Sequence, residues 1–313
     1  MGMLVDGQWR TKWYTPDEKG RFVRSETSYR DQLAPGGRFA PEPGRYRLYV
    51  SYACPWAHRT LMARSLYGLT DAVDVSIVDH FMGADGWQFS ETEGSIPDPD
   101  GAAFLRDVYL RADPGFTGRV TVPVLWDTRE QTIVNNESRE IIRMFSDCFA
   151  GAGRDLAPAH LRGVIDEVIT ANYESVNNGV YKAGFATTQF AYEEGVTALF
   201  DQLDRMEARL GQSRYLAGDQ LTEADLCLFA TLIRFDAVYV CHFKCNLRRI
   251  VDYPNLSNYL RDVYQVPGIA ETVNMFHIKQ HYFGSHESIN PHRVVPVGPE
   301  LDHNAPHDRD RFA

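Results

Sequence analysis

A predicted strand passes directly into a predicted helix at a Cys-Pro pair, and this junction constrains the fold more than any other feature of the sequence. Residues 45–51, RYRLYVS, carry β-branched and aromatic side chains in rough alternation and predict a strand. Residues 55–66, PWAHRTLMARSL, place apolar side chains at helical spacing. Pro55 suits the first helical position, because a missing N–H costs nothing there. Residues 73–78, VDVSIV, predict a second strand, so the order indicates a βαβ unit.

The same α/β pattern continues to about residue 148. Residues 120–126, VTVPVLW, predict a third strand, and residues 136–145, NESREIIRMF, predict a helix capped by Asn136. Between the second and third strands, residues 83–118 are rich in Gly and Pro and predict a long loop. A loop of this length inside a compact domain is usually functional or disordered.

From residue 161 onward the hydrophobic pattern is helical almost throughout. The predicted helices are 158–176, 189–211, 222–240, 254–264 and 267–281. Thr222 to Asp225, TEAD, has the form of a capping box with Asp in place of the usual Glu or Gln. The sequence therefore predicts four parts: an irregular extension over 1–44, an α/β domain over 45–150, an all-helical domain over 151–285 and a tail over 286–313.

Composition and charge exclude several classes of function. The 313 residues include 32 Lys and Arg against 42 Asp and Glu, a formal net charge of -10. A chain this acidic has no general electrostatic footprint for nucleic acid or an anionic membrane. The longest apolar stretch, residues 226–243, is interrupted by Arg234 and Asp236 and predicts a buried helix. An N-terminus without an apolar h-region and an odd number of cysteines, five, together predict a cytoplasmic protein.

Cys54 is the strongest candidate for a reactive group. It lies immediately before Pro55, which makes it the predicted cap residue of the helix, where the positive end of the helix dipole favours a thiolate. His58 and Arg59, one turn further on, are candidates for additional positive charge. The alternative is an inert buried cysteine, as most free cysteines are. A dithiol motif would need a second cysteine at position 57, where Ala57 stands, so the site is monothiol and an outside thiol such as glutathione must release any mixed disulfide.

Two further features are weaker by themselves. A proline within a strand, such as Pro123, is uncommon away from an edge, bulge or turn, yet only about 5% of X-Pro bonds are cis. Glu137 and Ser138 open a predicted helix, where they could bind an α-amino group and an α-carboxylate. Plain helix capping is the simpler interpretation of that pair.

Taken together, these residues resemble the cytosolic glutathione transferases, and most closely the Xi class, the glutathionyl-hydroquinone reductases. The resemblance spans nearly the whole chain. Seven strings carry it in order: YVSYACPWAHRT (49–60), RVTVPVLWD (119–127), IVNNESREI (133–141), NNGVYKAGFAT (177–187), LTEADL (221–226), VYVCHFKCN (238–246) and INPHRVVPVGP (289–299).

The resemblance implies a thioredoxin-like α/β domain followed by an all-α domain, with glutathione as co-substrate and a homodimeric assembly. It implies a cis bond before Pro123. Arg119 would meet a glutathione carboxylate, Val120 the cysteinyl backbone, and Glu137 with Ser138 the γ-glutamyl end. Trp87 would join the same site from the long loop. The implied quinone site comprises Tyr181, Tyr239 and Tyr282.

The implied reaction is the glutathione-dependent reduction of a glutathionyl-hydroquinone through a mixed disulfide on Cys54. Two alternatives stay open. One is a general thiol transferase or dehydroascorbate reductase of the omega-like kind, and the other is a non-catalytic interaction module on a transferase fold.

No metal is expected. Cys241 and Cys245 lack third and fourth ligands at suitable spacing, and His277 with His281 forms no His-Glu-x-x-His motif.

Overall fold

The computed structural model describes residues 2–12, 14–149 and 153–312, and the chain divides into two compact units. The first unit comprises Met1–Trp13, Ser25–Arg154 and Glu271–Val295. The second unit comprises Tyr14–Arg24, Asp155–Ala270 and Pro296–Ala313. The predicted boundary between residues 150 and 151 falls outside the described residues, and the two units meet in sequence at Arg154 and Asp155.

A four-stranded sheet forms the centre of the first unit, in the order β4-β3-β8-β9. β3 (Tyr46–Val50) pairs parallel with β4 (Val73–Ile77) and antiparallel with β8 (Val124–Asp127). β8 in turn pairs antiparallel with β9 (Thr132–Asn135). The three predicted strands are confirmed, although the third begins at Val124, after Pro123.

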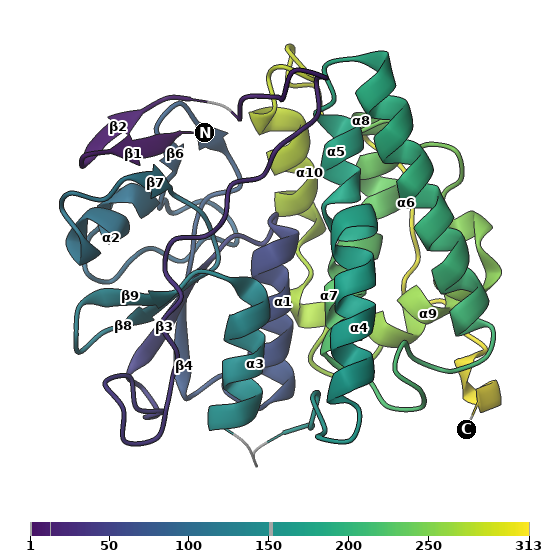
Figure 1. Ribbon diagram of the computed structural model, residues 1–313, viewed down its shortest axis with the longest axis horizontal. Helices are drawn as coiled ribbons and strands as arrows, with labels where there is room; N and C mark the ends of the chain where they lie inside the picture. The colour runs from purple at the N-terminus through teal and green to yellow at the C-terminus, as the bar shows by residue number, and fades with distance from the viewer. Residues whose placement is uncertain (1, 13, 150–152, 313) are drawn as a thin grey trace. The chain divides into compact units, whose positions relative to one another are not determined.

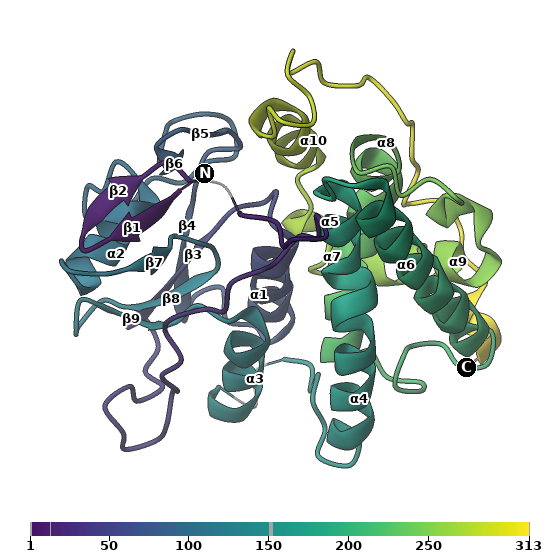
Figure 2. The ribbon, with the colours of Figure 1, turned by 45° about the horizontal axis from the view of Figure 1, so that its top comes forward.

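The sheet of the first unit lies between helices on both faces (Figures 1 and 2). α1 (Pro55–Leu66) and α3 (Ser138–Cys148) pack against each other on one face, and α2 (Leu105–Ala112) lies on the other. α3 buries Ile141 and Phe145, one helical turn apart, and so presents an apolar stripe to the core. The prediction of an α/β N-terminal domain is confirmed.

The predicted loop 83–118 is wrong over part of its length, because it contains regular elements. α2 buries Leu105, Val108 and Tyr109, an i, i+3, i+4 pattern too short to stand out between flanking Gly and Pro residues. A short hairpin also forms at its start, from β5 (Met82–Gly83) and β6 (Gly86–Trp87).

The N-terminal extension is likewise not wholly irregular. β1 (Met3–Val5) and β2 (Gln8–Arg10) form a hairpin, and β1 also pairs with β7 (Gly118–Arg119). The turn is Asp6-Gly7, both with positive φ (47° and 72°), as two-residue hairpin loops require. The Asp-Gly pair is the sequence signal for this hairpin, so the prediction of an irregular extension over 1–44 is wrong for residues 3–10.

The second unit is helical, as predicted. Its helices and helical turns are α4 (Arg162–Asn172), η1 (Tyr173–Asn177), α5 (Gly179–Gly184), α6 (Gln189–Leu210), α7 (Glu223–Arg234), η2 (Phe235–Tyr239), α8 (Val240–His242), η3 (Ile250–Asp252), α9 (Pro254–Tyr264) and η5 (Arg309–Phe312). α6 packs against α5 and α9, and α7 packs against α4 and α9 (Figure 1). η1 and η2 are π-helical segments that continue α4 and α7.

The predicted capping box at the start of α7 is confirmed. Asp225 Oδ2 accepts hydrogen bonds from the backbone N–H of Thr222 (2.8 Å) and from its hydroxyl (2.9 Å). Asp225 Oδ1 accepts from the backbone N–H of Leu216 (2.9 Å) and from the hydroxyl of Tyr259 (3.0 Å). One fully buried carboxylate therefore joins the helix cap to the preceding loop and to α9.

The predicted helix 267–281 is wrong in its position and in its domain. Pro267-Gly268 interrupts the pattern, with Gly268 at φ 94°, and α10 runs instead over Met275–Ser285. Asn274 caps it by accepting from the backbone N–H of His277 (2.9 Å). α10 belongs to the first unit, where Ser285 Oγ accepts from Met82 N (3.0 Å), so the first unit ends at Val295 and not near residue 150.

The end of the predicted tail docks on the second unit. The buried guanidinium of Arg309 donates to the carbonyls of Leu210 (2.8 Å), Ser213 (2.5 Å) and Arg214 (2.7 Å). A cation at the carboxyl end of α6 also complements the dipole of that helix. Within the described residues, no helix is both long enough and apolar enough to span a membrane.

Candidate functional site

Cys54 occupies the predicted position at the start of α1. It is the N-cap residue, with extended backbone (φ -77°, ψ 120°), and Pro55 is the first helical residue. The thiol is half-buried, and its Sγ lies 3.7 Å from the carbonyl oxygen of Val122. The side chain therefore combines access to solvent with the positive end of a helix, the setting in which a thiolate is favoured.

The loop opposite Cys54 carries the second predicted feature. The peptide bond between Val122 and Pro123 is cis, as the resemblance implied. Val120 and Val122 are largely buried, and Pro123 immediately precedes β8. The structure thus brings Cys54 to this loop from a position 68 residues away in the sequence.

The start of α3 carries Glu137 and Ser138. Glu137 is the N-cap residue, and its carboxylate accepts from the backbone N–H of Arg139 (3.2 Å) and, more weakly, from the hydroxyl of Ser138 (3.4 Å). The backbone N–H of Glu137 donates to Asn135 Oδ1 (2.7 Å). The capping interpretation of Glu137 is therefore correct, whatever further role the carboxylate has.

Arg59 links the first turns of α1 and α3. Its guanidinium donates to the hydroxyl of Ser138 (3.4 Å) and lies 4.4 Å from the ring centroid of Trp56. Only 2% of Arg59 is exposed, so a buried cation stands beside the start of α3. The sequence suggested this arginine as a neighbour of Cys54, but its link to Ser138 is a contact over 79 residues that no local pattern signals.

His58, the other cation candidate near Cys54, has a partner in a distant segment. Its Nε2 lies 2.9 Å from the hydroxyl of Thr272, and the ring is fully buried. This hydrogen bond connects α1 to the segment that leads into α10, all within the first unit.

Trp87 and Arg119 come from the short strands of the first unit. Trp87, on β6, is 7% exposed and stacks on His281 of α10, with ring centroids 4.7 Å apart. His281 Nδ1 lies 3.0 Å from the carbonyl of His80, which fixes the imidazole beside the indole. Arg119, on β7, donates to the carbonyl of Lys12. The sequence predicted neither the contact of Trp87 with His281 nor that of Arg119 with Lys12, because both join segments far apart in the sequence.

The structure brings two of the three predicted tyrosines together. Tyr181, on α5, and Tyr239, at the end of η2, have ring centroids 6.3 Å apart in the second unit. The ring centroid of Phe243 lies 5.4 Å from each of theirs, and the Phe243 ring stacks nearly parallel to that of Tyr239. π-Helical segments such as η2 occur frequently at functional sites, but this sequence gave no signal for one.

Tyr282 belongs to the other unit. It lies on α10, it is 1% exposed, and its ring packs edge-on against His281 and His286 at 5.4 Å and 5.3 Å. The prediction that residues 151–285 carry all three tyrosines as one domain is therefore wrong for Tyr282, because α10 clusters with the first unit.

Four residues were considered as metal ligands: Cys241, Cys245, His277 and His281. His277 Nε2 lies 2.6 Å from the carbonyl of Glu93, and burial lowers the pKa of this imidazole. Cys241 is exposed, whereas Cys245 is buried and burial raises the pKa of its thiol. Within residues 2–12, 14–149 and 153–312, no three His, Cys, Asp or Glu side chains are grouped so as to hold a metal ion.

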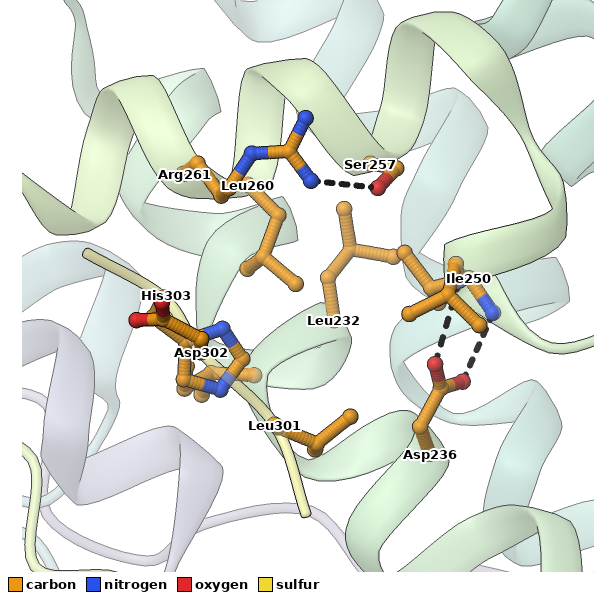
Figure 3. A pocket seen from close by; sticks show the side chains of 11 residues that line it. Leu232, Asp236, Ile250, Ser257, Leu260, Arg261, Leu301, Asp302 and His303 are labelled. Atoms are coloured by element: carbon orange, nitrogen blue, oxygen red, sulfur yellow. Dashed lines mark hydrogen bonds between the residues drawn. The ribbon is translucent and has the colours of Figure 1, made fainter. Parts of the chain in front are cut away.

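A small cavity lies in the second unit between α7, η2, η3, α9 and the tail (Figure 3). Asp236 lines it, and its carboxylate accepts from the backbone N–H groups of Ile250 (2.6 Å) and Val251 (3.1 Å). The cavity has a volume of about 40 Å³, room for a few water molecules at most. None of the predicted site residues lines it, so it is separate from the candidate site.

Comparison with known families covers both halves of the chain. Residues 53–148 match the glutathione S-transferase N-terminal domain, and residues 189–262 match the glutathione S-transferase C-terminal domain. The first match includes Cys54, Pro123, Glu137 and Ser138, and the second includes Tyr239.

Full-length relatives are also similar. The chain is 52% identical to the glutathionyl-hydroquinone reductase YqjG of Escherichia coli, over 99% of both proteins. It is 52% identical to the glutathionyl-hydroquinone reductase PcpF of Sphingobium chlorophenolicum, over 96% of both. Among solved structures, a Xi-class glutathione transferase from Natrialba magadii superposes with a TM-score of 0.94 at 52% identity, covering 100% of this chain and 98% of that one. The glutathione-bound structure of YqjG superposes with a TM-score of 0.89 at 49% identity, covering 98% of this chain and 99% of that one.

Proposed function

The chain belongs to the Xi class of the glutathione transferases, the family of the glutathionyl-hydroquinone reductases, and on this premise we propose how its residues perform that reduction. The observation that carries the proposal is the monothiol Cys54 at the N-terminus of α1, 3.7 Å from the Val122 carbonyl. The substrate is an aromatic ring that carries glutathione through a thioether, and the products are the free hydroquinone and oxidised glutathione.

In the first half-reaction, the Cys54 thiolate attacks the sulfur of the glutathionyl group. The ring first shifts to a keto tautomer, in which the carbon bonded to sulfur has gained a proton. When the C–S bond breaks, its electron pair returns to the ring and the negative charge develops on the ring oxygen. A new S–S bond joins Cys54 to glutathione, so sulfur is oxidised and the ring carbon is reduced.

In the second half-reaction, a second glutathione thiolate attacks the mixed disulfide. This forms oxidised glutathione and restores the Cys54 thiolate. Ala57 stands at the position of a resolving cysteine in a dithiol motif, so the mixed disulfide must wait for this outside thiol. Both half-reactions use one glutathione site, and ping-pong kinetics follow.

The contacts of the first unit support a glutathione site around Cys54. Glu137 and Ser138 lie at the positive end of α3, which suits the charged γ-glutamyl group. The buried Arg59 adds positive charge beside Ser138. In this proposal Arg119 binds a glutathione carboxylate, and Trp87, held against His281, covers the peptide.

The backbone of the cis-proline loop completes that proposed site. Val120 pairs with the cysteinyl part of glutathione, and Pro123 fixes the loop that faces the Cys54 thiol. The glutathione of the substrate is thereby aligned with its sulfur in front of Cys54.

We assign the aromatic ring of the substrate to Tyr181, Tyr239 and Tyr282. A tyrosine hydroxyl placed beside a ring oxygen assists the tautomerisation and stabilises the charge that develops there. The 6.3 Å separation of the Tyr181 and Tyr239 ring centroids supports a shared role for those two.

We also propose a homodimer in the cytoplasm. The homodimer follows from the family resemblance. The cytoplasm keeps glutathione largely reduced, and the second half-reaction consumes reduced glutathione, so that compartment suits the chemistry.

The test replaces Cys54 by serine and compares it with Cys148→Ser, a matched control at a second half-buried cysteine. Turnover of a glutathionyl-hydroquinone should vanish in Cys54→Ser and persist in Cys148→Ser. Mass spectrometry of the wild type, quenched after exposure to substrate without free glutathione, should show one glutathione on Cys54. Substantial turnover by Cys54→Ser would refute the thiolate mechanism. A wild type that reduces disulfides but leaves the aromatic thioether intact would indicate a general thiol transferase.

A further inference from the structure

The segment Tyr14–Arg24 of the N-terminal extension belongs to the second unit. It is fixed there by hydrogen bonds to its own carbonyl groups: Thr187 N donates to the carbonyl of Gly20 (3.0 Å), and the Thr188 hydroxyl donates to the carbonyl of Lys19 (2.7 Å). Arg21 pairs with Glu194 of α6 at 2.5 Å. These bonds hold the segment against the connection between α5 and α6.

Arg24, the last residue of this segment, lies over the ring of Tyr181. Its guanidinium carbon is 4.9 Å from the Tyr181 ring centroid and 5.3 Å from that of Phe22. Its Nε donates to Asn178 Oδ1 (2.9 Å). Asn178 is 4% exposed and is the N-cap residue of α5, the helix that carries Tyr181. One buried side chain therefore fixes the cation at the face of this tyrosine.

Tyr181 is the accessible tyrosine of the aromatic group around it, which also contains Phe185, Tyr239 and Phe243. Tyr181 and Phe185 are partly exposed, whereas Tyr239 and Phe243 are fully buried. A cation over the face of a phenol binds the phenolate more strongly than the neutral phenol, because the ring then carries negative charge. Arg24 therefore makes the Tyr181 hydroxyl a stronger hydrogen-bond donor.

We propose that Arg24 is a positioning residue of the hydroquinone site, acting on the ring oxygen of the substrate through the Tyr181 hydroxyl. The inference rests on the proposed function, since it assigns Tyr181 to the ring. When the C–S bond breaks, the electron pair passes to the ring oxygen and the sulfur joins Cys54. At that moment the Tyr181 hydroxyl donates to the developing oxyanion, and the nearby guanidinium stabilises the charge that the phenol oxygen shares.

This role distinguishes aromatic from disulfide substrates. A disulfide releases a thiolate and has no ring oxygen, so the Tyr181 hydroxyl has no part in its cleavage. Loss of the positive charge at Arg24 should therefore slow thioether cleavage selectively. Cation–π interactions of ordinary strength correspond to a change of about 2- to 30-fold in rate.

The experiment compares Arg24→Gln, Arg24→Met and Arg24→Lys with Arg21→Met in the full-length protein. Glutamine keeps a donor for Asn178 without the charge, methionine removes both, and lysine keeps the charge. Arg21 comes from the same segment and forms an ion pair at the surface, so Arg21→Met is the matched control. The two substrates are 2-glutathionyl-hydroquinone and bis(2-hydroxyethyl) disulfide, each assayed with free glutathione.

With the thioether, kcat should fall about 10-fold in Arg24→Gln and Arg24→Met, while KM for glutathione stays unchanged. Arg24→Lys should retain most of the rate, and Arg21→Met should match the wild type. Disulfide reduction should stay within about 2-fold of the wild type in all four variants.

Three results would overturn the inference. Equal losses on both substrates would show a structural role for Arg24, and unchanged thioether kcat in Arg24→Gln and Arg24→Met would remove it from the site. A lysine variant as slow as the methionine variant would show that charge is not the cause. A wild type inactive on the thioether would overturn the proposed function itself, and the inference with it. Thioether turnover in the wild type, with an unchanged kcat in both neutral variants, would overturn the inference alone.

Discussion

Replacing Asp225 tests how the second unit holds α7, the helix that leads into Tyr239. Its carboxylate is fully buried and accepts four hydrogen bonds, two of them from the backbone N–H groups of Leu216 and Thr222. In Asp225→Asn the amide keeps one oxygen, and its NH₂ group then faces donors. The hydroxyls of Thr222 and Tyr259 can turn away, but a backbone N–H cannot.

At least one buried N–H is thus left without an acceptor in Asp225→Asn, at a cost of about 1–3 kcal/mol in the free energy of unfolding. Asp225→Ala leaves both backbone N–H groups, those of Leu216 and Thr222, without an acceptor, which should lower the free energy of unfolding by about 2–6 kcal/mol. That range overlaps the whole stability of many domains. We therefore expect Asp225→Asn to fold with reduced stability and Asp225→Ala to fold poorly.

The raised pKa of Asp225 also predicts in which direction the stability changes with pH. Burial raises the pKa of Asp225 to about 6 from its ordinary 3.8, outweighing the four hydrogen bonds that favour the charged form. The pKa of Asp225 is higher in the folded protein than in the unfolded chain, so protonation of this carboxyl stabilises the fold. This contribution to the free energy of unfolding is fully present below about pH 4 and disappears as the pH rises through 6. Relative to Asp225→Asn, the wild type should gain about 1.4 kcal/mol between about pH 7.5 and about pH 5.

Urea unfolding of both proteins at the two pH values measures this difference. Taking the difference between wild type and variant cancels the other titrating groups. Asp201→Asn, at an exposed position of α6, is the control and should show no such change with pH. A wild-type advantage that is constant with pH, or that grows as the pH rises, would refute the reasoning about the buried carboxylate.

Two other substitutions test the glutathione site and the docking of the tail. In the proposed glutathione site, Arg119→Gln removes a charge-assisted bond to a glutathione carboxylate. Such a bond is worth about 1.5–3 kcal/mol, so calorimetry should show glutathione binding weakened roughly 10- to 100-fold; unchanged affinity would exclude Arg119 from the site. Arg309→Met leaves the carbonyls of Leu210, Ser213 and Arg214 without their guanidinium and should lower the free energy of unfolding by about 2 kcal/mol or more. A melting temperature equal to that of the wild type would show that the tail adds no stability.

The sequence predicted the parts of the fold and of the candidate site that depend on local chemistry. Pro55 after a predicted strand located the start of α1, and with it the N-cap position of Cys54. The capping box at Asp225 located the start of α7 in the same way. In both cases the side chain and the backbone groups it affects lie within a few residues of each other, so a short sequence pattern is enough to predict the interaction.

Contacts between distant segments could not be predicted in this way. The link from Arg59 to Ser138, the stack of Trp87 on His281 and the placement of Arg24 over Tyr181 all depend on the assembled fold. The cis bond at Pro123 is an intermediate case. Local statistics opposed it, and only the likeness to a known family predicted it correctly.

The prediction that α10 belongs to the all-helical domain is wrong for a further reason. Its residues have helical periodicity, which is all that a sequence pattern reports, and they follow a long series of other helices. Periodicity does not say which core a helix covers. Ser285, which accepts from Met82 N, and His281, which stacks on Trp87, show that α10 completes the first unit.

The late position of α10 in the chain has a consequence for biosynthesis. The first unit draws its last segment, Glu271–Val295, from beyond nearly all of the second unit. During translation the ribosome must therefore synthesise residues 155–270 of the second unit before the support for Trp87 emerges. Neither unit is a continuous stretch that a single proteolytic cut could release intact. The unit that carries Cys54 thus begins to form early in synthesis and is completed only after residues 155–270 have been made.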